Sequence, residues 1–271
     1  MLIIQMVSYI ETCEKAVREG GNTLVEMLGN VSVRLKSRAD LVTDADLAAQ
    51  KIITNSIHRA FPTHAILGEE DTGTNITCPI EAEFCWVIDP LDGTTNYAHN
   101  VPHFSVSVAL LERGEPRVGC VFDPIRNELF SAEKGQGTRL NGKPIHTSNI
   151  TAVADALAAI GFPPGVDQHS ADLQAFLRAV PQFQAIRRTG SAALNLAYVA
   201  VGRFDTSWSY AAKIWDMAAG VLLVSEAGGV ACSPWGGSLE VETGRFLASA
   251  NDQLNQEVVR LLNTPPLATN G

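Results

Sequence analysis

Apolar residues recur at helical spacing in the first thirty residues of the chain and again between residues 47 and 60. The first set ends near Gly29, and a short alternating stretch from Val31 to Lys36 follows it. Thr43 or Asp44 stands before the second set as a candidate N-cap, and Phe61-Pro62 ends it. The pattern predicts two helices with a short strand between them.

From residue 65 the chain changes to short apolar runs separated by turns. These runs predict strands at Ala65–Leu67, Phe84–Ile88, Ser105–Leu111, Arg117–Phe122 and Glu128–Ala132. The turns at residues 112–116 and 123–127 make the last three strands look like a meander.

Beyond about residue 150, helical patterns return and alternate with short strands. Helices are expected at Ala171–Val180, Ala192–Val201, Met217–Glu226 and Gln253–Leu262, and strands at Ala156–Ile160, Ala185–Arg187, Phe204–Trp208 and Phe246–Ala250. Mixed order of this kind predicts an α/β to α+β fold with at least two sheets. We expect residues 1–271 to form one domain, and the only candidate division into subdomains lies near residue 150.

Composition and charge narrow the class of protein. The 271 residues are 46% hydrophobic and carry a formal net charge of −9, without a cluster of Lys and Arg, so a nucleic acid polymer is not expected as a partner. No apolar run reaches the roughly 18 residues of a membrane helix, and the first residues lack the basic region of a secretory signal. Five scattered cysteines favour a reducing compartment, so we expect a cytoplasmic protein.

The segment from Phe84 to Asn96 carries the strongest chemical signal. A strand-like run ends in Asp89, a proline turn leads to Asp92, and Gly93-Thr94 stands where a helix should begin. Two close carboxylates suit Mg²⁺, and amides at a helix start suit a phosphate, so the segment predicts metal-dependent phosphoryl chemistry. The alternative at this point is that both aspartates only form a turn and a cap.

Two further acidic positions change that balance. Gly68-Glu69-Glu70-Asp71 follows a predicted strand, and Asp216 stands at the head of an apolar helix. Taken singly, the first is typical of a solvated loop and the second of an N-cap. Taken together, four carboxylates lie at the edges of apolar elements.

These segments resemble the two signatures of the inositol monophosphatase family. The first is Trp86-Val87-Ile88-Asp89-Pro90-Leu91-Asp92-Gly93-Thr94-Thr95-Asn96-Tyr97, and the second runs from Trp215-Asp216-Met217-Ala218-Ala219-Gly220 to Glu226-Ala227-Gly228-Gly229. Residues 35–37, 40–46, 68–70, 119–124 and 188–193 also match the family pattern. The resemblance covers about residues 5 to 262.

The resemblance implies a layered αβαβα sandwich with two mixed sheets, and a homodimer. It implies hydrolysis of a small phosphorylated metabolite, a phosphate monoester, by a water that Mg²⁺ activates, with inhibition by lithium. Two or three Mg²⁺ ions per subunit would be held by Glu69, Asp89, the carbonyl of Leu91, Asp92 and Asp216. Glu69, Asp89, Asp92 and Asp216 sum to −4, which two Mg²⁺ ions would neutralise.

The resemblance also assigns roles around the metal. Asp46, the Thr94 hydroxyl and Glu69 would be catalytic, with Asp46 and Thr94 orienting the attacking water. Lys36 would lie on a mobile hairpin that closes over the site. Phosphate or substrate contacts would come from Gly93, Thr94, Lys36, Gly190, Ser191, Ala192 and Ser209.

Other classes fit the residues less well. A haloacid-dehalogenase-like phosphatase has its two aspartates two positions apart, whereas Asp89 and Asp92 are three apart. Asp44 and Asp46 lack the glycine and terminal glutamate of an EF-hand loop. A catalytically idle interaction protein is disfavoured because every expected ligand is present.

The substrate stays open at this point. Animal members have a glutamate seven residues before the second-signature aspartate, and this chain has Ser209 there. The alternatives to inositol monophosphate are fructose 1,6-bisphosphate, histidinol phosphate and 3′-phosphoadenosine 5′-phosphate. Lys213 adds a positive charge that either lies near the cleft or points to solvent.

Overall fold

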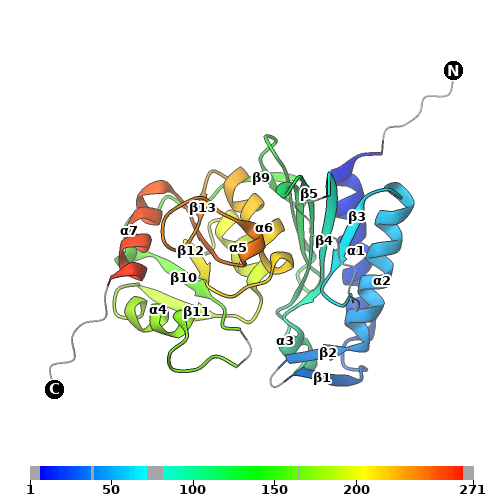
Figure 1. Ribbon diagram of the computed structural model, residues 1–271, viewed down its shortest axis with the longest axis horizontal. Helices are drawn as coiled ribbons and strands as arrows, with labels where there is room; N and C mark the ends of the chain where they lie inside the picture. Colours follow the sequence, from blue (N-terminus) through cyan, green and yellow to red (C-terminus); the bar gives the residue numbers. More distant parts are fainter. Residues whose placement is uncertain (1–6, 38–39, 72–81, 164, 265–271) are drawn as a thin grey trace.

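The structure is a computed structural model that describes residues 7–37, 40–71, 82–163 and 165–264 (Figure 1). Within these residues the helices are α1 (Tyr9–Met27), α2 (Asp44–Ala60), α3 (Thr94–Ala98), α4 (Ala171–Ala179), α5 (Ala192–Ala200), α6 (Ile214–Glu226) and α7 (Asp252–Asn263), with 3-10 turns η1 (Val153–Asp155) and η2 (Val241–Thr243).

The described strands form one hairpin and two mixed sheets. The hairpin joins β1 (Val33–Ser37) to β2 (Asp40–Thr43). The larger sheet contains, in spatial order, β3 (Ala65–Gly68), β4 (Phe84–Asp92), β5 (Ser105–Glu112), β6 (Glu115–Asp123), β7 (Glu128–Glu133), β8 (Thr138–Leu140) and β9 (Lys143–Ile145). The smaller contains β11 (Ala185–Arg188), β10 (Leu157–Ile160), β12 (Thr206–Ser209), β14 (Phe246–Ser249) and β13 (Val230–Cys232). In the larger sheet only β3 and β4 pair in parallel.

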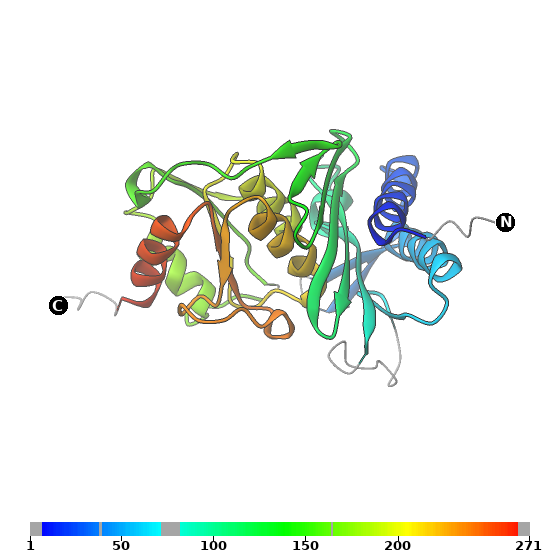
Figure 2. The same cartoon turned by 90° about the horizontal axis from the view of Figure 1, so that it is seen from above.

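Helices and sheets alternate in five layers. Helices α1 and α2 cover one face of the larger sheet, α5 and α6 lie between the two sheets, and α4 and α7 cover the outer face of the smaller sheet (Figures 1 and 2). Three buried clusters fill the spaces between these layers. The predicted αβαβα sandwich with two mixed sheets is therefore confirmed.

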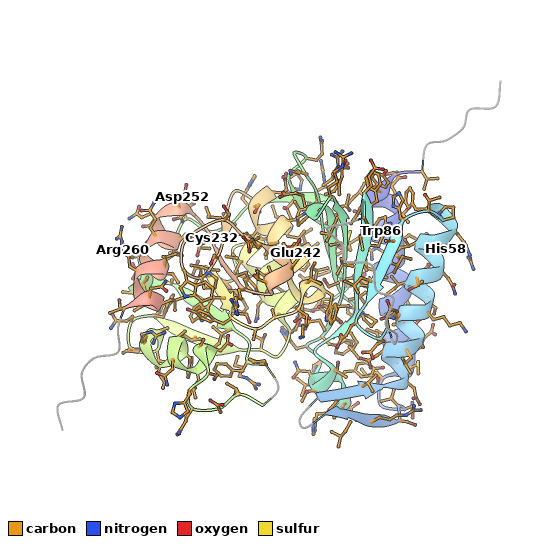
Figure 3. All side chains as sticks on the ribbon, in the orientation of Figure 1. His58, Trp86, Cys232, Glu242, Asp252 and Arg260 are labelled. Carbon is orange, nitrogen blue, oxygen red and sulfur yellow. The ribbon has the colours of Figure 1, made fainter. Side chains whose placement is uncertain are left out.

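Strand β4 is the central element for the site, and both of its faces are covered. Cys85 and Val87 belong to the cluster beneath α5 and α6, whereas Trp86 and Ile88 belong to the cluster beneath α1 and α2. Trp86 is labelled on this strand in Figure 3. Burial on both faces explains why β4 reads as a continuous apolar run rather than an alternating one.

The predicted helices and longer strands are confirmed with shifts of a few residues at their ends. The short strands β2, β8, β9 and β13 were not predicted, because three or four residues carry little pattern and are defined by their partners. The prediction that the central strand ends at Asp89 was wrong. β4 continues to Asp92, and Pro90 is accommodated because the pairing with β5 is irregular between Asp89 and Asp92.

The chain crosses from the larger sheet to the smaller one near residue 150, where the sequence suggested a boundary between subdomains. The chain leaves the larger sheet after β9 and enters the smaller one at β10, on either side of residue 150. The organisation of residues 1–271 as a single domain stays a prediction.

Two further expectations concern membranes and cysteines. No helix in the described ranges is long and apolar enough to cross a membrane. The cysteines in those ranges, Cys13, Cys85, Cys120 and Cys232, form no disulfide, and Cys78 lies outside the described residues.

Candidate active site

The irregular end of β4 places two aspartates at one edge of the larger sheet. Asp89 pairs with Ser107 of β5, and Asp92 pairs with Ser105, so three steps on β4 oppose two on β5. The Leu91 amide donates a hydrogen bond to Asp89 Oδ1 at 3.0 Å. A bulge of this kind redirects side chains at a strand end, and here it leaves both carboxylates buried at the same edge.

Glu69 reaches the same edge from the neighbouring strand. β3 and β4 run in parallel with Gly68 opposite Ile88, and the Glu69 amide donates to the Ile88 carbonyl at 3.0 Å. Glu69 and Asp89 therefore leave adjacent strands side by side. Burial raises the pKa of Asp89 well above its usual value, and the charges of Glu69, Asp92 and Asp216 and a hydrogen bond with the Glu69 side chain raise it further.

Asp92 faces the N-terminus of α5. Its Oδ2 accepts hydrogen bonds from the Ser191 hydroxyl and from the Ala193 amide at 2.7 Å, and its Oδ1 accepts from the Ala192 amide at 3.2 Å. Burial raises the pKa of Asp92 to about 6, although these hydrogen bonds favour the ionised form. The start of α5 thus stabilises a carboxylate that the protein interior would otherwise neutralise.

Asp216 enters from the first turn of α6. Its Oδ2 accepts from the Lys213 amide at 2.7 Å. The preceding carbonyl, that of Trp215, accepts from the Ser107 hydroxyl at 3.0 Å, and Ser107 is the β5 partner of Asp89. Burial and the charge of Asp92 raise the pKa of Asp216. These contacts and charges together put the start of α6 beside the end of β4.

A second polar pair lies on the side of α2. Asp46 is fully buried, and its Oδ2 accepts from the Thr43 amide at 2.8 Å and from the Thr43 hydroxyl. Its Oδ1 lies 3.3 Å from the Thr94 hydroxyl, which is also 3.1 Å from the Leu91 carbonyl oxygen. Burial raises the pKa of Asp46. The hydroxyl therefore connects α2 to the bulge of β4.

Two glycines shape the turn that begins α3. Gly93 has a φ of +99° and Gly190 a φ of +92°, which is backbone that L side chains rarely adopt. A Cβ on Gly93 would lie 3.2 Å from the Gly190 carbonyl oxygen, and one on Gly190 would lie 2.7 Å from the Asn96 amide nitrogen. Asn96 Nδ2 in turn donates to the carbonyls of His103 and Thr189 at 2.7 and 2.9 Å. The two loops consequently pack closely beside Asp92, through the Gly190 backbone and the Asn96 side chain.

The donor set suits a hard divalent cation. Glu69, Asp89, Asp92 and Asp216 offer only oxygen. Burial first, and then the charges of neighbouring carboxylates, raise the pKa values of Asp89, Asp92 and Asp216, so positive charge would relieve the repulsion. A carboxylate oxygen that accepts one amide hydrogen retains a lone pair for a cation. Over the described ranges, no three Asp, Glu, His or Cys side chains are already gathered in metal-binding geometry. The residues therefore fit Mg²⁺ by chemistry and proximity rather than by a preformed coordination shell.

The other predicted substrate residues differ in what the structure shows. Lys36 lies in β1, and its side chain is outside the described part; Arg34 of the same strand reaches Asp44 of α2 at 3.3 Å. Ser191 and Ala192 contact Asp92. Ser209 is buried at the end of β12, and its hydroxyl accepts from the Ala211 amide at 3.2 Å.

Lys213 is exposed in front of Asp216. Burial raises the pKa of Asp216, and the charge of Lys213 partly offsets that rise, so the ammonium group lies within electrostatic reach of this carboxylate. Of the two alternatives left by the sequence, the structure shows an exposed position, and the charge of Lys213 still reaches Asp216.

Some residues that build the site were missed by the sequence reasoning. Ser107 and Gln50 hold groups at this edge and were not named, whereas Thr43 was named only as a helix cap and Asp71 only as part of the acidic segment. Of the two residues not named, Gln50 carried a signal, because it lies four residues after Asp46 and so on the same face of a helix. The other is identified by its partner in space.

Known proteins resemble the chain over most of its length. The model of the inositol monophosphatase family matches residues 6–265. The Nus factor SuhB of Pseudomonas aeruginosa is 43% identical over 241 residues, which are 86% of this chain and 88% of that protein. The inositol-1-monophosphatase of Synechocystis is 40% identical over 266 residues, 96% of this chain and 90% of that protein.

A solved structure agrees with the fold. The extragenic suppressor protein suhB of Bartonella henselae superposes with a TM-score of 0.87 at 36% identity, and the match covers 94% of this chain and 98% of that one. Together with the matched family model, these likenesses show that the chain belongs to the inositol monophosphatase family.

Proposed function

We propose that the protein is a Mg²⁺-dependent phosphatase that hydrolyses a small phosphate monoester of a sugar or polyol by direct attack of water. The observation that carries this proposal is the convergence of Glu69, Asp89, Asp92 and Asp216 at the end of β4, opposite the Asp46–Thr94 pair. The four carboxylates by themselves would repel a phosphate. Two divalent cations would neutralise them and allow the phosphate to approach.

In this proposal Glu69, Asp89, the Leu91 carbonyl, Asp92 and Asp216 hold two or three Mg²⁺ ions. When bound, Mg²⁺ supplies the positive charge that offsets the carboxylates and makes water a nucleophile near neutral pH. The hydrogen bonds from α5 to Asp92 and from the Lys213 amide to Asp216 favour the ionised form of these two side chains and orient them.

Asp46 and Thr94 orient the attacking water. Because the Thr94 hydroxyl donates its hydrogen toward Asp46 or the Leu91 carbonyl, its oxygen lone pairs are left to accept a hydrogen from water. The amides of Gly93 and Thr94 hold the phosphate, with Lys36, Gly190, Ser191 and Ala192 around it. In this proposal no side chain acts as a nucleophile, so no phospho-enzyme forms.

The substrate is the finer part of the proposal. Inositol monophosphate is accepted, but Ser209 offers a shorter and uncharged grip on ring hydroxyls than a glutamate would. The charge of Lys213 near Asp216 favours a substrate with a second anionic group. A broad preference among sugar and polyol phosphates follows.

The test is phosphate release by the purified chain with Mg²⁺ from inositol 1-phosphate, fructose 1,6-bisphosphate, histidinol phosphate and 3′-phosphoadenosine 5′-phosphate. Asp89→Asn should abolish release from every accepted substrate. Asp155→Asn, the same change at an exposed position of η1, is the matched control and should leave activity unchanged. Equal activity of Asp89→Asn and the unaltered chain would refute the proposed site.

A second function is favoured by one specific observation. Two relatives at 43% and 44% identity are called Nus factors. A role in transcription is therefore a second candidate function, either instead of phosphatase activity or beside it. With 29 acidic against 20 basic residues, such a role would rest on contacts with protein rather than with nucleic acid backbone. Asp89→Asn separates the two, because it should remove hydrolysis and leave binding to a transcription complex intact.

Three further expectations stay with this proposal. The protein is a homodimer, acts in the cytoplasm and is inhibited by lithium. Light scattering of the purified chain measures the first, fractionation of cells the second, and hydrolysis at rising lithium concentration the third.

A further inference from the structure

A buried glutamine of α2 holds the turn that carries Glu69. Gln50 Oε1 accepts a hydrogen bond from the Glu70 amide at 2.9 Å, and its Nε2 donates to Asp71 Oδ1 at 2.8 Å. Asp71 Oδ2 accepts from the Gly68 amide at 2.7 Å. The backbone on both sides of Glu69 is thus fixed by one amide and one carboxylate.

The glycine at position 68 is explained by the same contact. A Cβ there would lie 2.5–2.6 Å from all three atoms of the Gln50 amide. Only a residue without a side chain lets this amide approach the turn. Gly68 and Asp71 of the acidic segment therefore serve the backbone rather than a ligand.

Gln50 and the Glu69 carboxylate lie on opposite sides of the turn that joins them. Leu67 packs in the cluster beneath α5 and α6, and Gly68 faces α2. Glu69 lies in the turn after β3, and its side chain forms a hydrogen bond with Asp89, which by alternation along β4 shares the face of Val87. Gln50 and Asp71 accordingly support the turn from behind and leave the carboxylate on the side of the site.

The position of Gln50 also links the two halves of the site. It lies one helical turn after Asp46, which contacts Thr94. A single rigid helix therefore sets both the Asp46–Thr94 pair and the Glu69 turn, and Figure 1 shows α2 running beside β3 and β4.

We propose that Gln50 and Asp71 are positioning residues that fix the Glu69 turn against α2 and thereby set the affinity of the Glu69 side of the site for Mg²⁺. This inference rests on the proposed function, because it concerns the same metal ligands. Neither residue touches the metal, and both act through the amides of Gly68 and Glu70.

The hydrogen-bond pattern offers a charge-neutral swap as a test. Gln50→Glu alone sets a carboxylate against Asp71, and Asp71→Asn alone sets an amide NH₂ group against the Gln50 NH₂ group. In the double variant the new glutamate accepts from the new asparagine and from the Glu70 amide, and the asparagine oxygen accepts from the Gly68 amide. The net charge of the pair is unchanged.

Mg²⁺ binding by isothermal titration calorimetry, without substrate, is the readout. Each single variant should lose about tenfold in Mg²⁺ affinity, the effect of one mispaired, partly buried hydrogen bond. The double variant should return to within about threefold of the unaltered chain. Asn55→Asp is the matched control, because it makes the same amide-to-acid change at an exposed position of α2 and should bind Mg²⁺ normally.

Thermal melts separate positioning from mere stability. Asp71 is exposed, so Asp71→Asn should fold even if Gln50→Glu does not. Single variants that melt earlier but bind Mg²⁺ as tightly as the unaltered chain would overturn the inference, as would a folded double variant without recovery. If the unaltered chain binds no Mg²⁺, the proposed function fails and this inference with it.

Discussion

Removing the Thr94 hydroxyl should lower the rate of hydrolysis without much effect on the fold. Thr94 is partly exposed, and its hydroxyl is shared between Asp46 Oδ1 at 3.3 Å and the Leu91 carbonyl at 3.1 Å. Only one hydrogen is available for these two long contacts. Their loss in Thr94→Ala should therefore cost about 0.5–1.5 kcal/mol in the free energy of unfolding.

The kinetic effect should be much larger. Thr94→Ala removes the oxygen that accepts a hydrogen from the attacking water, and it also leaves Asp46 without this contact. A positioned group that acts on a proton in the transition state contributes about 10²–10⁴-fold to the rate. That range corresponds to about 3–5 kcal/mol in the activation free energy. Because the hydroxyl acts on water rather than on substrate, KM should change little.

Steady-state kinetics of phosphate release give kcat and KM for each variant. Thr94→Ser keeps the hydroxyl and should retain most of the rate. Thr95→Ala makes the same kind of change at the exposed neighbouring position and should leave kcat unchanged. A Thr94→Ala enzyme with a raised KM and an unaltered kcat would refute the reasoning, because Thr94 would then bind substrate and not orient water.

Three other substitutions test the charge of Asp89, the protonation of His64 and the effect of Ser209 on substrate specificity. Burial raises the pKa of Asp89 above 3.8, so the metal-free chain should lose stability as the pH rises above that value. Without metal at pH 8, Asp89→Asn should therefore melt at a higher temperature than the unaltered chain. Mg²⁺ should not raise its melting temperature, and its kcat should be lower by several orders of magnitude. Burial lowers the pKa of His64 below 6.5, and the Trp86 indole donates to its Nδ1 at 3.1 Å; melting temperature should therefore fall between pH 7.5 and 5.5, and fall less in His64→Gln, whereas His58→Gln, an exposed control, should follow the unaltered chain. Ser209→Glu should raise kcat/KM for inositol monophosphate relative to fructose 1,6-bisphosphate by about tenfold, and Ser209→Ala should not; a hundredfold preference for inositol monophosphate in the unaltered chain would contradict this reading of Ser209.

The longer elements could be predicted because their pattern is local. Helix α1 buries residues at helical spacing, with Ala16 and Val17 followed by Leu24, and Ser8 caps it as an N-cap hydroxyl. Short strands such as β8 and β9 could not, because their three residues are fixed by neighbours in the sheet rather than by their own sequence.

For the candidate site, the sequence indicated the carboxylates but not the residues whose hydrogen bonds hold the surrounding backbone in place. Asp89 and Asp92 stood out because carboxylates interrupt an apolar run. The strand nevertheless continues past Pro90, since the bulge opposite β5 tolerates a proline that a regular ladder would exclude. The bonds from Gln50 to Asp71 and from Ser107 to Trp215 span 21 and 108 positions. No local pattern in one sequence reports such pairs.

Hydrolysis before and after removal of divalent cations tests the central claim most directly. With the best substrate of the panel, excess chelator should abolish phosphate release, and added Mg²⁺ should restore it to the starting rate. Hydrolysis in ¹⁸O-labelled water should place the label in the released phosphate, because water attacks phosphorus and not the carbon of the ester. Full activity in excess chelator would contradict the account.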